Sequence, residues 1–377
     1  MVIRSRTMTK ENILYVTHSS KKGGAEQSLI HLLNNLDTSK FNIYLVCPKG
    51  TEYLNEVMVP FTEINLKLES IKQGNFLNYL KEVLSLKKII KKSNVKVVHA
   101  NGWRAPWYVA PMRLLSKSKI IWHHRDKFDS KVYNYFLPLF FNNVICISNF
   151  VKGTLSNSVH HKCKVIYNGV DLKHIAETNK INNSNLDHDY FNIGTFGRIV
   201  EWKRLESIIY SLKIFKDRNP NILWKFYIVG DISIDGNTEY LDVLKKKVNE
   251  LNLEAHIVFY GHTSNPLGFM REFDITINFS DREPFGRVII ESLLMKTPVI
   301  VADSGGAPEI IRDTLGGIIV PDNDFNELAR AIENMHNMEQ YEYDNMVERG
   351  FKAVYTKFDM SKLVKEVMYI YDDLISK

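Results

Sequence analysis

The chain has 377 residues, a length that favours two domains over one core. Its 45% hydrophobic and 24% charged residues exclude a disordered or fibrous protein. Residues 1–175 hold 26 Lys and Arg against 11 Asp and Glu, and residues 176–377 hold 23 against 32, so we expect the basic first half and the acidic second half to meet different partners.

The basic first half fits an anionic membrane, a phosphorylated acceptor, nucleic acid, or a solvated surface without a partner. Its lysines are dispersed and accompany no nucleic-acid-binding motif, so no nucleic acid is expected. The three widely spaced cysteines indicate a reducing compartment and no zinc site. Because no signal peptide or run of ~18 apolar residues is present, we expect a cytoplasmic protein, with peripheral contact to the inner face of the cell membrane left open.

Short apolar runs alternate with helical patterns through the first half, which predicts an open α/β sheet. Gly23 and Gly24 follow the first run and precede a helix. A glycine turn between strand and helix lets a phosphate or another ligand approach the backbone. The predicted strands of this half are 12–17, 41–47, 95–100, 119–122, 143–148 and one beginning at 163.

Polar side chains follow two of these strands. Trp103 lies in the loop after the strand 95–100, and His123, His124 and Arg125 end the run that begins at residue 119. Ligands bind at such carboxyl ends of open sheets, and imidazole or guanidinium groups suit phosphates and sugar hydroxyls. Adjacent histidines of a strand point to opposite faces, so we expect only one of the two to reach a site. The sequence does not decide which of His123, His124 and Arg125 enters it.

Two further stretches of the first half combine apolar and basic or aromatic residues. Residues 76–92 predict a basic amphipathic helix, and residues 132–141 are rich in aromatics. We expect the apolar face of the helix to dock on its own sheet, while its lysines could still face anionic lipid. Core packing is the default for the aromatic segment, and contact with a membrane interface is the alternative.

The polar, aperiodic stretch 176–190 predicts a linker, after which strands and helices resume. The strand 191–196 leads into Gly197, with Arg198 and Lys203 close behind, and such a turn could hold a diphosphate from two sides. Strands 224–229 and 256–260 likewise end in glycine. Their glycines would let a base or ribose lie near the backbone, and the residues that follow the strands are Gly230-Asp231 and Gly261-His262.

Two carboxylates bracket a predicted helix start in the second half. Glu283 precedes the turn Pro284-Phe285-Gly286, and Glu291 lies about two turns into the buried helix that follows. Sugar or ribose hydroxyls would satisfy such carboxylates, and the free N–H groups of the helix start would suit a diphosphate. The alternative is an ordinary helix start with an acidic residue favouring its dipole and an ion pair further along.

In this order the motifs resemble those of the retaining GT-B glycosyltransferases of family four, the group 1 type. The pieces are 23–26, 165–171, 197–198 with Lys203, 230–231, 261–262, Glu283 with Glu291, and 298–302 with Gly305, Gly306 and Glu309. The resemblance implies an α/β protein of GT-B fold, with two Rossmann-like α/β/α domains facing across a cleft. Residues 1–178 would bind the acceptor, residues 191–355 the nucleotide sugar, and 356–377 would form a helix crossing back to the first domain.

The resemblance also implies roles for single residues. Arg198 and Lys203 would neutralise the diphosphate, Glu291 would bind the ribose hydroxyls, and Glu283 would contact the donor sugar, with nucleophilic attack by Glu283 as the less favoured alternative. The catalytic set would be Arg198, Lys203 and Glu283. Further donor contacts would come from Gly24, Gly230, His262, Phe285, Gly286 and Arg287. Contacts to the acceptor or donor sugar from the first domain would come from Gly23, Gly24, Trp103, His124 and Arg125.

The implied function is metal-independent transfer of a hexosyl group with retention, from a nucleotide-diphosphate sugar to a glycan or lipid-linked acceptor in bacterial surface polysaccharide biosynthesis. A UDP-sugar is expected before a GDP-sugar, and no cofactor or metal is expected. The alternative is a non-catalytic sugar-nucleotide-binding protein of the same fold. The chain departs from the family where Arg125 takes a place commonly held by histidine, and where bulky residues 293–296 replace small ones.

Overall fold

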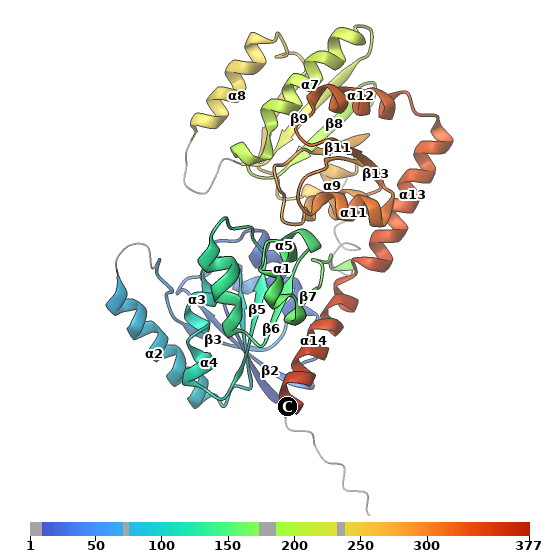
Figure 1. The fold of residues 1–377 in the computed structure, drawn as a ribbon. Helices are drawn as coiled ribbons and strands as arrows, with labels where there is room; N and C mark the ends of the chain where they lie inside the picture. The colour runs from blue at the N-terminus through green and yellow to red at the C-terminus, as the bar shows by residue number, and fades with distance from the viewer. Residues whose placement is uncertain (1–9, 71–74, 173–185, 232–237) are drawn as a thin grey trace, which may run out of the picture. The chain divides into compact units, whose positions relative to one another are not determined.

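The computed structural model describes residues 10–70, 75–172, 186–231 and 238–377, which form two compact units (Figure 1). The first unit comprises residues 1–169 and 360–377, and the second comprises residues 170–359. The predicted boundary at residue 178 and most of the predicted linker 176–190 fall within 173–185, outside the described residues. Each unit is built on one parallel sheet.

The first sheet has the strand order β3-β2-β1-β4-β5-β6-β7, with every pair parallel. Its order therefore reverses between β1 and β4. At such a reversal open sheets leave a crevice on the side where the carboxyl ends of the strands lie, which we call the carboxyl edge. The strands are β1 Glu11–Val16, β2 Phe41–Cys47, β3 Phe61–Asn65, β4 Val97–Asn101, β5 Lys119–His124, β6 Asn143–Cys146 and β7 Cys163–Val165. Its helices include α1 Gly24–Asn34, α2 Phe76–Lys92, α3 Ala105–Val109, α4 Met112–Leu115 and α5 Asn149–Gly153.

The strands predicted in this half are confirmed, and β3 was missed. β3 lies at the edge of the sheet, and none of its residues is fully buried. An edge strand of this kind lacks the continuous apolar run that marks a buried parallel strand. The local sequence therefore gives it no distinguishing signal.

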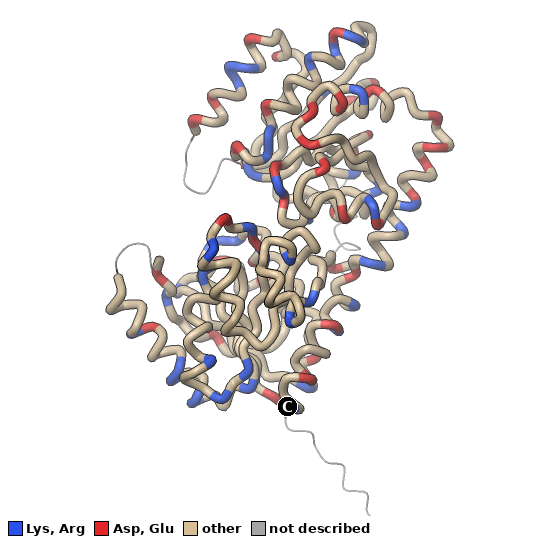
Figure 2. Tube along the Cα trace, in the orientation of Figure 1, with Lys and Arg blue, Asp and Glu red and all other residues tan. Residues whose placement is uncertain are grey.

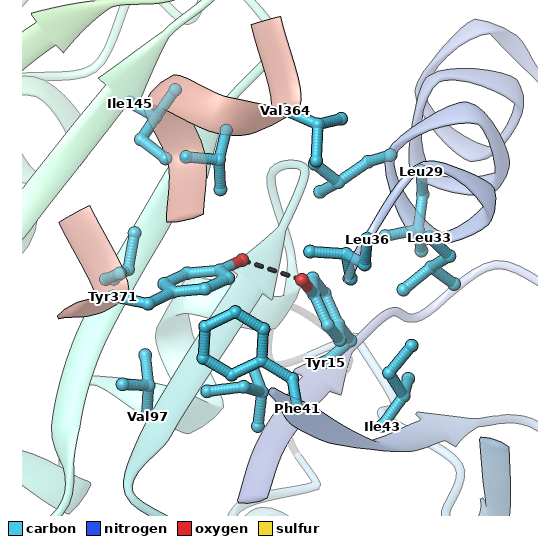
Figure 3. Packing of buried hydrophobic residues seen from close by; sticks show 14 of the residues in the cluster. Tyr15, Leu29, Leu33, Leu36, Phe41, Ile43, Val97, Ile145, Val364 and Tyr371 are labelled. Atoms are coloured by element: carbon cyan, nitrogen blue, oxygen red, sulfur yellow. Dashed lines mark hydrogen bonds between the residues drawn. The ribbon is translucent and has the colours of Figure 1, made fainter. Parts of the chain in front are cut away.

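The last helix of the chain, α14 (Met360–Ser376), belongs to the core of the first unit. Its buried face packs among residues of α1, β1 and β2, and Figure 1 draws it in red beside this sheet. At the centre of the cluster the hydroxyls of Tyr15 and Tyr371 lie 2.7 Å apart and point toward one another (Figure 3). The end of the chain is thus built into the domain that its beginning forms.

The amphipathic helix α2 is confirmed over its full range, but only one side of it docks as expected. Val83, Leu86 and Ile90 are buried, whereas Leu77 and Leu84 are 80% and 53% exposed. The aromatic segment forms the short helices η3 (Val132–Phe136) and η4 (Leu137–Phe140), and each of them has both buried and exposed apolar side chains. Its buried members are Tyr133, Leu137 and Phe141, and its exposed ones are Val132, Tyr135, Phe136 and Leu139.

The second sheet has the strand order β10-β9-β8-β11-β12-β13, again with parallel pairs, and its order reverses between β8 and β11. The strands are β8 Phe191–Phe196, β9 Trp224–Val229, β10 Ile257–Gly261, β11 Ile275–Asn278, β12 Val299–Ala302 and β13 Gly317–Val320. The helices are α7 Leu205–Arg218, α8 Glu239–Glu250, α9 Pro266–Met270, α10 Arg287–Leu294, α11 Ala307–Thr314, α12 Phe325–His336 and α13 Gln340–Lys357.

The predicted strands β8, β9 and β10 and the predicted start of α10 are confirmed. The strands β11, β12 and β13 have only four residues each, too few for an apolar run to be separated from a buried helix by periodicity. Across the described ranges, no helix combines the length and the apolar character that a bilayer span requires.

Adjacent residues of α14 provide a test of how the first unit is held together. Ile370 is 8% exposed within the core cluster, and Tyr369 beside it is 72% exposed. Ile370→Ala should lower the free energy of unfolding of the first unit by about 2–5 kcal/mol, because it leaves a cavity in the core. Tyr369→Ala should change it by less than about 0.5 kcal/mol.

Native-state hydrogen exchange of the β1 amides measures this change for the first unit alone. Equal effects of the two substitutions would contradict the placement of α14 in this core.

Candidate functional site

An ion pair joins two loops of the second unit where its strand order reverses. The loop after β8 carries Lys203, in the short helix η6 (Glu201–Lys203), and the loop after β11 carries Glu283. The Lys203 ammonium lies 2.7 Å from Glu283 Oε2, and the side chains are 14% and 12% exposed. The ammonium also lies over the ring of Trp202, 4.5 Å from its centroid. A cation and a carboxylate are therefore brought into contact at the carboxyl edge of this sheet.

Backbone packing against Gly305 fixes the position of Glu283. The two residues form an isolated parallel bridge, and the Gly306 N–H donates to the Glu283 carbonyl at 2.6 Å. Gly305 has φ +73°, and a Cβ there would lie 2.3 Å from the same carbonyl oxygen. Only glycine allows both this conformation and this close approach. The loop after β12 thus holds the carboxylate that the loop after β11 carries.

A second close approach shapes the neighbouring strand ends. A Cβ on Gly230 would lie 1.9 Å from the Gly197 carbonyl oxygen, and the Gly230 N–H donates to the Gly261 carbonyl at 2.8 Å. Gly230 also has φ +149°, a conformation that side chains disfavour. The ends of β8, β9 and β10 therefore meet through backbone atoms. The close approach at Gly230 therefore requires glycine, because the Gly197 carbonyl occupies the place that a side chain would take.

The second carboxylate of the motif lies on α10. Glu291 Oε1 accepts a hydrogen bond from Arg287 at 2.6 Å, in an i,i+4 pair whose side chains are 16% and 17% exposed. The helix begins after Gly286, which has φ +96°. Phe285 is buried 6.1 Å from the ring of Phe358, so its side chain packs in the core and only its backbone remains available to a ligand.

The remaining predicted donor residues are exposed. Arg198 and His262 lie on the loops after β8 and β10, and within the described ranges neither side chain has a polar partner. The sequence-based analysis missed Arg204, whose left-handed backbone (φ +51°) directs its guanidinium to Asp281 at 3.0 Å and to Asp322 at 2.5 Å. Arg204 thus adds a second ion pair between the loops after β8 and β11, and its place beside Lys203 was the available signal.

In the first unit, aromatic and basic groups gather where the order reverses between β1 and β4. The ring of Trp103 lies edge-on to His18 at 5.2 Å, and the Arg104 guanidinium lies 4.8 Å from the Trp103 centroid. Burial, reinforced by Arg104, lowers the pKa of His18 to about 4. Gly23 caps α1, and Gly24 is exposed with open space around its Cβ position. Sequence reasoning had not singled out His18, which immediately follows β1 and Thr17.

Arg125 lies inside the first unit. It is 5% exposed, and its Nε and NH1 groups donate to Asn101 Oδ1 and Asn168 Oδ1, each at 2.7 Å. Asn101 is the last residue of β4, Asn168 follows β7 and Arg125 itself follows β5, so one guanidinium ties together the ends of three strands. Because its hydrogen bonds are charge-assisted and therefore strong, Arg125 holds these strand ends in place at the carboxyl edge of the sheet.

A chain of buried hydrogen bonds runs from Arg125 to α14. Arg125 NH2 lies 3.3 Å from His123 Nδ1, which lies 3.1 Å from His99 Nε2, and His99 Nδ1 lies 2.6 Å from the Tyr371 hydroxyl. Burial, with Arg125 adding to it, lowers the pKa of His99 to about 3 and that of His123 well below its usual value. Both rings are therefore neutral at physiological pH.

The direction of every bond in this chain follows from the arginine. A guanidinium only donates, so His123 Nδ1 accepts and His99 must donate to it from Nε2. His99 Nδ1 then accepts from Tyr371, whose oxygen accepts from Tyr15. His123 consequently carries its proton on Nε2. Because the Arg125 guanidinium can only donate, it fixes the tautomers of both His123 and His99, each with its proton on Nε2.

His124 points to the opposite face of β5, as predicted for adjacent strand residues. Its ring lies 4.3 Å from that of Trp122 and 5.6 Å from that of Tyr133. Both ring nitrogens are buried without a hydrogen-bond partner among the described residues. Burial lowers the pKa of His124 to about 3. Within the same residues no group of three or more His, Cys, Asp or Glu side chains could hold a metal ion.

The buried histidines make a pH-dependent prediction. A histidine of the unfolded chain titrates near pH 6.5, so between about pH 6.5 and pH 3 the unfolded state binds more protons than the folded one. The free energy of unfolding should fall as the pH drops through this window. His124→Phe should make that fall shallower, and at pH 7.5 it should leave stability unchanged or raise it by up to about 1 kcal/mol, because no hydrogen bond is lost.

His99→Phe is the matched control for this prediction. It should lower the free energy of unfolding by about 1–3 kcal/mol at pH 7.5, because Tyr371 and His123 each lose a partner. Hydrogen exchange of the β5 amides at pH 7.5 and pH 5, corrected for intrinsic rates, measures both effects. An unchanged pH dependence in His124→Phe would contradict a buried neutral imidazole at this position.

Comparisons with known proteins agree with this architecture. The family model "Glycosyltransferase Family 4" matches residues 22–174, and the model "Glycosyl transferases group 1" matches residues 176–353. The structure of Anabaena Alr3699/HepE in complex with UDP and glucose superposes with a TM-score of 0.79 at 22% identity, covering 96% of this chain and 99% of that one.

Two curated relatives have named activities. The capsular polysaccharide biosynthesis glycosyltransferase CapM of Staphylococcus aureus is 28% identical over 56% of this chain and 54% of its own length. The N-acetylgalactosamine-N,N'-diacetylbacillosaminyl-diphospho-undecaprenol 4-alpha-N-acetylgalactosaminyltransferase of Campylobacter jejuni is 24% identical over 93% of this chain and 96% of its own length. With two parallel-sheet units and both family models matched in succession, the chain belongs to the group 1 glycosyltransferases of family 4 and has their GT-B fold.

Proposed function

We propose that this protein is a retaining, metal-independent glycosyltransferase that moves a hexosyl group from a nucleotide-diphosphate sugar to a glycan or lipid-linked acceptor. The contact between Lys203 and Glu283 carries the proposal. Lys203 supplies a positive charge for a diphosphate at the point where the second sheet reverses its order. A sugar bonded to that diphosphate would lie within reach of the adjacent carboxylate.

The other residues of the second unit take complementary parts of the donor. Arg198 is exposed and would turn its guanidinium to the diphosphate, together with the backbone N–H groups at the start of α10 near Phe285, Gly286 and Arg287. Glu291 would accept from the ribose hydroxyls while Arg287 holds it in place. Gly230 and His262 would lie beside the nucleotide, where the strand ends meet through backbone atoms.

The proposed chemistry uses these charges in the transition state. As the bond from the anomeric carbon to the phosphate oxygen breaks, negative charge grows on the diphosphate and positive charge on the sugar. Lys203, Arg198 and the α10 N–H groups stabilise the leaving group, which is the work a divalent ion would otherwise do. The acceptor hydroxyl attacks the face from which the phosphate departs and gives its proton to the phosphate oxygen. Glu283 binds the sugar in this scheme and does not form a bond to it.

The first unit would bind the acceptor. Gly23 and Gly24 lie at the start of α1, after β1, and Trp103 lies on the loop after β4, where an acceptor can approach the carboxyl edge of that sheet. Arg125 and His124 are buried and would act by holding this edge in shape.

A UDP-sugar is the first donor to test and a GDP-sugar the second, because HepE was solved with UDP and glucose. The names of the two curated relatives favour surface polysaccharide synthesis and a lipid-linked acceptor. A polyprenyl-linked acceptor resides in a membrane. The protein would then work in the cytoplasm at the inner face of the cell membrane, with its basic first unit toward the anionic lipid.

The ribose role of Glu291 can be tested without knowing the acceptor. Glu291→Gln should weaken UDP binding by about 10- to 100-fold, because a charge-assisted hydrogen bond is lost. Calorimetric titration with UDP and with 2′,3′-dideoxy-UDP should show that the unchanged protein prefers UDP and that the variant no longer discriminates. Glu342→Gln, an exposed change on α13, is the control. Retained discrimination in Glu291→Gln would remove the ribose assignment.

The role of Glu283 can be tested by turnover. With a donor identified by thermal stabilisation, Glu283→Gln should reduce transfer by about 10- to 100-fold and leave UDP affinity within about twofold, because only a contact to the sugar weakens. A loss beyond about 10⁴-fold would instead indicate a covalent nucleophile. NMR of the product should show the anomeric configuration of the donor. Donor binding without transfer to any acceptor would favour the non-catalytic alternative.

A further inference from the structure

One face of α2 is apolar yet exposed. Phe76, Leu77, Leu80 and Leu84 are 62%, 80%, 41% and 53% exposed. At 100° per residue these four side chains fall within one side of the helix, and Val83, Leu86 and Ile90, which pack inward, fall on another. The helix therefore has two apolar sides and needs only one of them to hold its place on the sheet.

Lysines continue the exposed face toward the end of the helix. The spacing of Phe76, Leu80, Leu84, Lys87 and Lys91 is i, i+4, i+8, i+11 and i+15, which keeps them in one stripe. The neighbouring Lys81, Lys88 and Lys92 are also exposed. Figure 2 shows the basic residues gathered on the C-terminal half of α2. The stripe is thus apolar in its first half and basic in its second.

The exposed stripe has an apolar neighbour. Tyr79 on α2 donates from its hydroxyl to the Trp107 carbonyl of α3 at 3.1 Å, and the Trp107 ring lies 6.3 Å from that of Tyr133. Tyr133 lies in the segment η3–η4, whose outward side chains Val132, Tyr135, Phe136 and Leu139 are each more than half exposed. Helix α3 therefore links two elements that both present apolar side chains outward.

We infer that the exposed face of α2 is a docking surface for an anionic lipid bilayer. Leucine and phenylalanine side chains would enter the boundary between headgroups and acyl chains, while the lysines bind the anionic headgroups. Charge complementarity selects this occupant: of the charged residues on α2, five are lysines and one, Glu82, is acidic. The inference rests on the proposed function in one respect, that a lipid-linked acceptor would bring the enzyme to such a surface.

Vesicle flotation tests the surface independently of catalysis. The full chain is mixed with phosphatidylcholine vesicles in which about one lipid in three is phosphatidylglycerol, and separately with pure phosphatidylcholine vesicles. Binding should require the anionic lipid and should fall as salt is raised from about 0.1 M to 1 M. Leu77→Gln with Leu84→Gln should lower the partition coefficient at least roughly tenfold, because two leucines no longer bury apolar area.

The basic half is tested separately. Lys87→Gln, Lys88→Gln and Lys91→Gln should each lower the partition coefficient by roughly fivefold. Matched controls on the second unit are Leu223→Gln, where the leucine is 56% exposed, and Lys245→Gln with Lys246→Gln on α8, where both lysines are exposed. The controls should bind vesicles as the unchanged protein does.

Thermal unfolding and UDP binding of every variant are measured in parallel, and the α2 variants should match the unchanged protein in both. Vesicle binding that ignores the α2 substitutions, or that is absent at low salt, would overturn the docking surface. Failure of the proposed function has a different signature, because loss of nucleotide binding or transfer leaves the vesicle result unaffected.

Discussion

The contact between Lys203 and Glu283 depends on a constraint of parallel sheets. Parallel strands place all their carboxyl ends at one edge, and a reversal of strand order leaves the two central loops side by side without a connecting crossover between them. Residues eighty positions apart can then meet as a close ion pair. Gly305 makes the contact possible, because any side chain there would collide with the backbone of Glu283. Gly230 in the same way lets the ends of β8 and β9 approach each other.

The first unit follows the same rule with different chemistry. Its reversal point gathers His18, Trp103 and Arg104, and its neighbouring strand ends are joined by the buried guanidinium of Arg125. Buried charge is costly unless hydrogen bonds surround it. The amides of Asn101 and Asn168 meet that need, and the histidine chain extends the order imposed by Arg125 as far as α14. A residue in the last turns of the chain, Tyr371, is thereby linked to the carboxyl edge of the first sheet.

The charge asymmetry also acquires a physical meaning. The acidic second half pairs much of its charge internally, as Lys203, Arg204 and Arg287 do with carboxylates. The basic first half places lysines on an exposed helix face beside leucines. These lysines have few acidic neighbours on that helix, so their field is available to a partner.

The sequence by itself determined the alternating strands and helices, the full extent of α2, the glycine-ended strands and the order of the family motifs. These are local features, set by hydrophobic periodicity and turn chemistry over a few residues. It could not show β3 or the four-residue strands β11 to β13, because so few residues carry no distinctive period. Only the tertiary structure decided that Arg125 lies inside, that His123 hydrogen-bonds to His99 while His124 has no such partner among the described residues, that Arg204 bridges two loops, and that half of the apolar face of α2 stays exposed. Each of these depends on which distant side chains share one edge of a sheet, and no spacing along the chain encodes that.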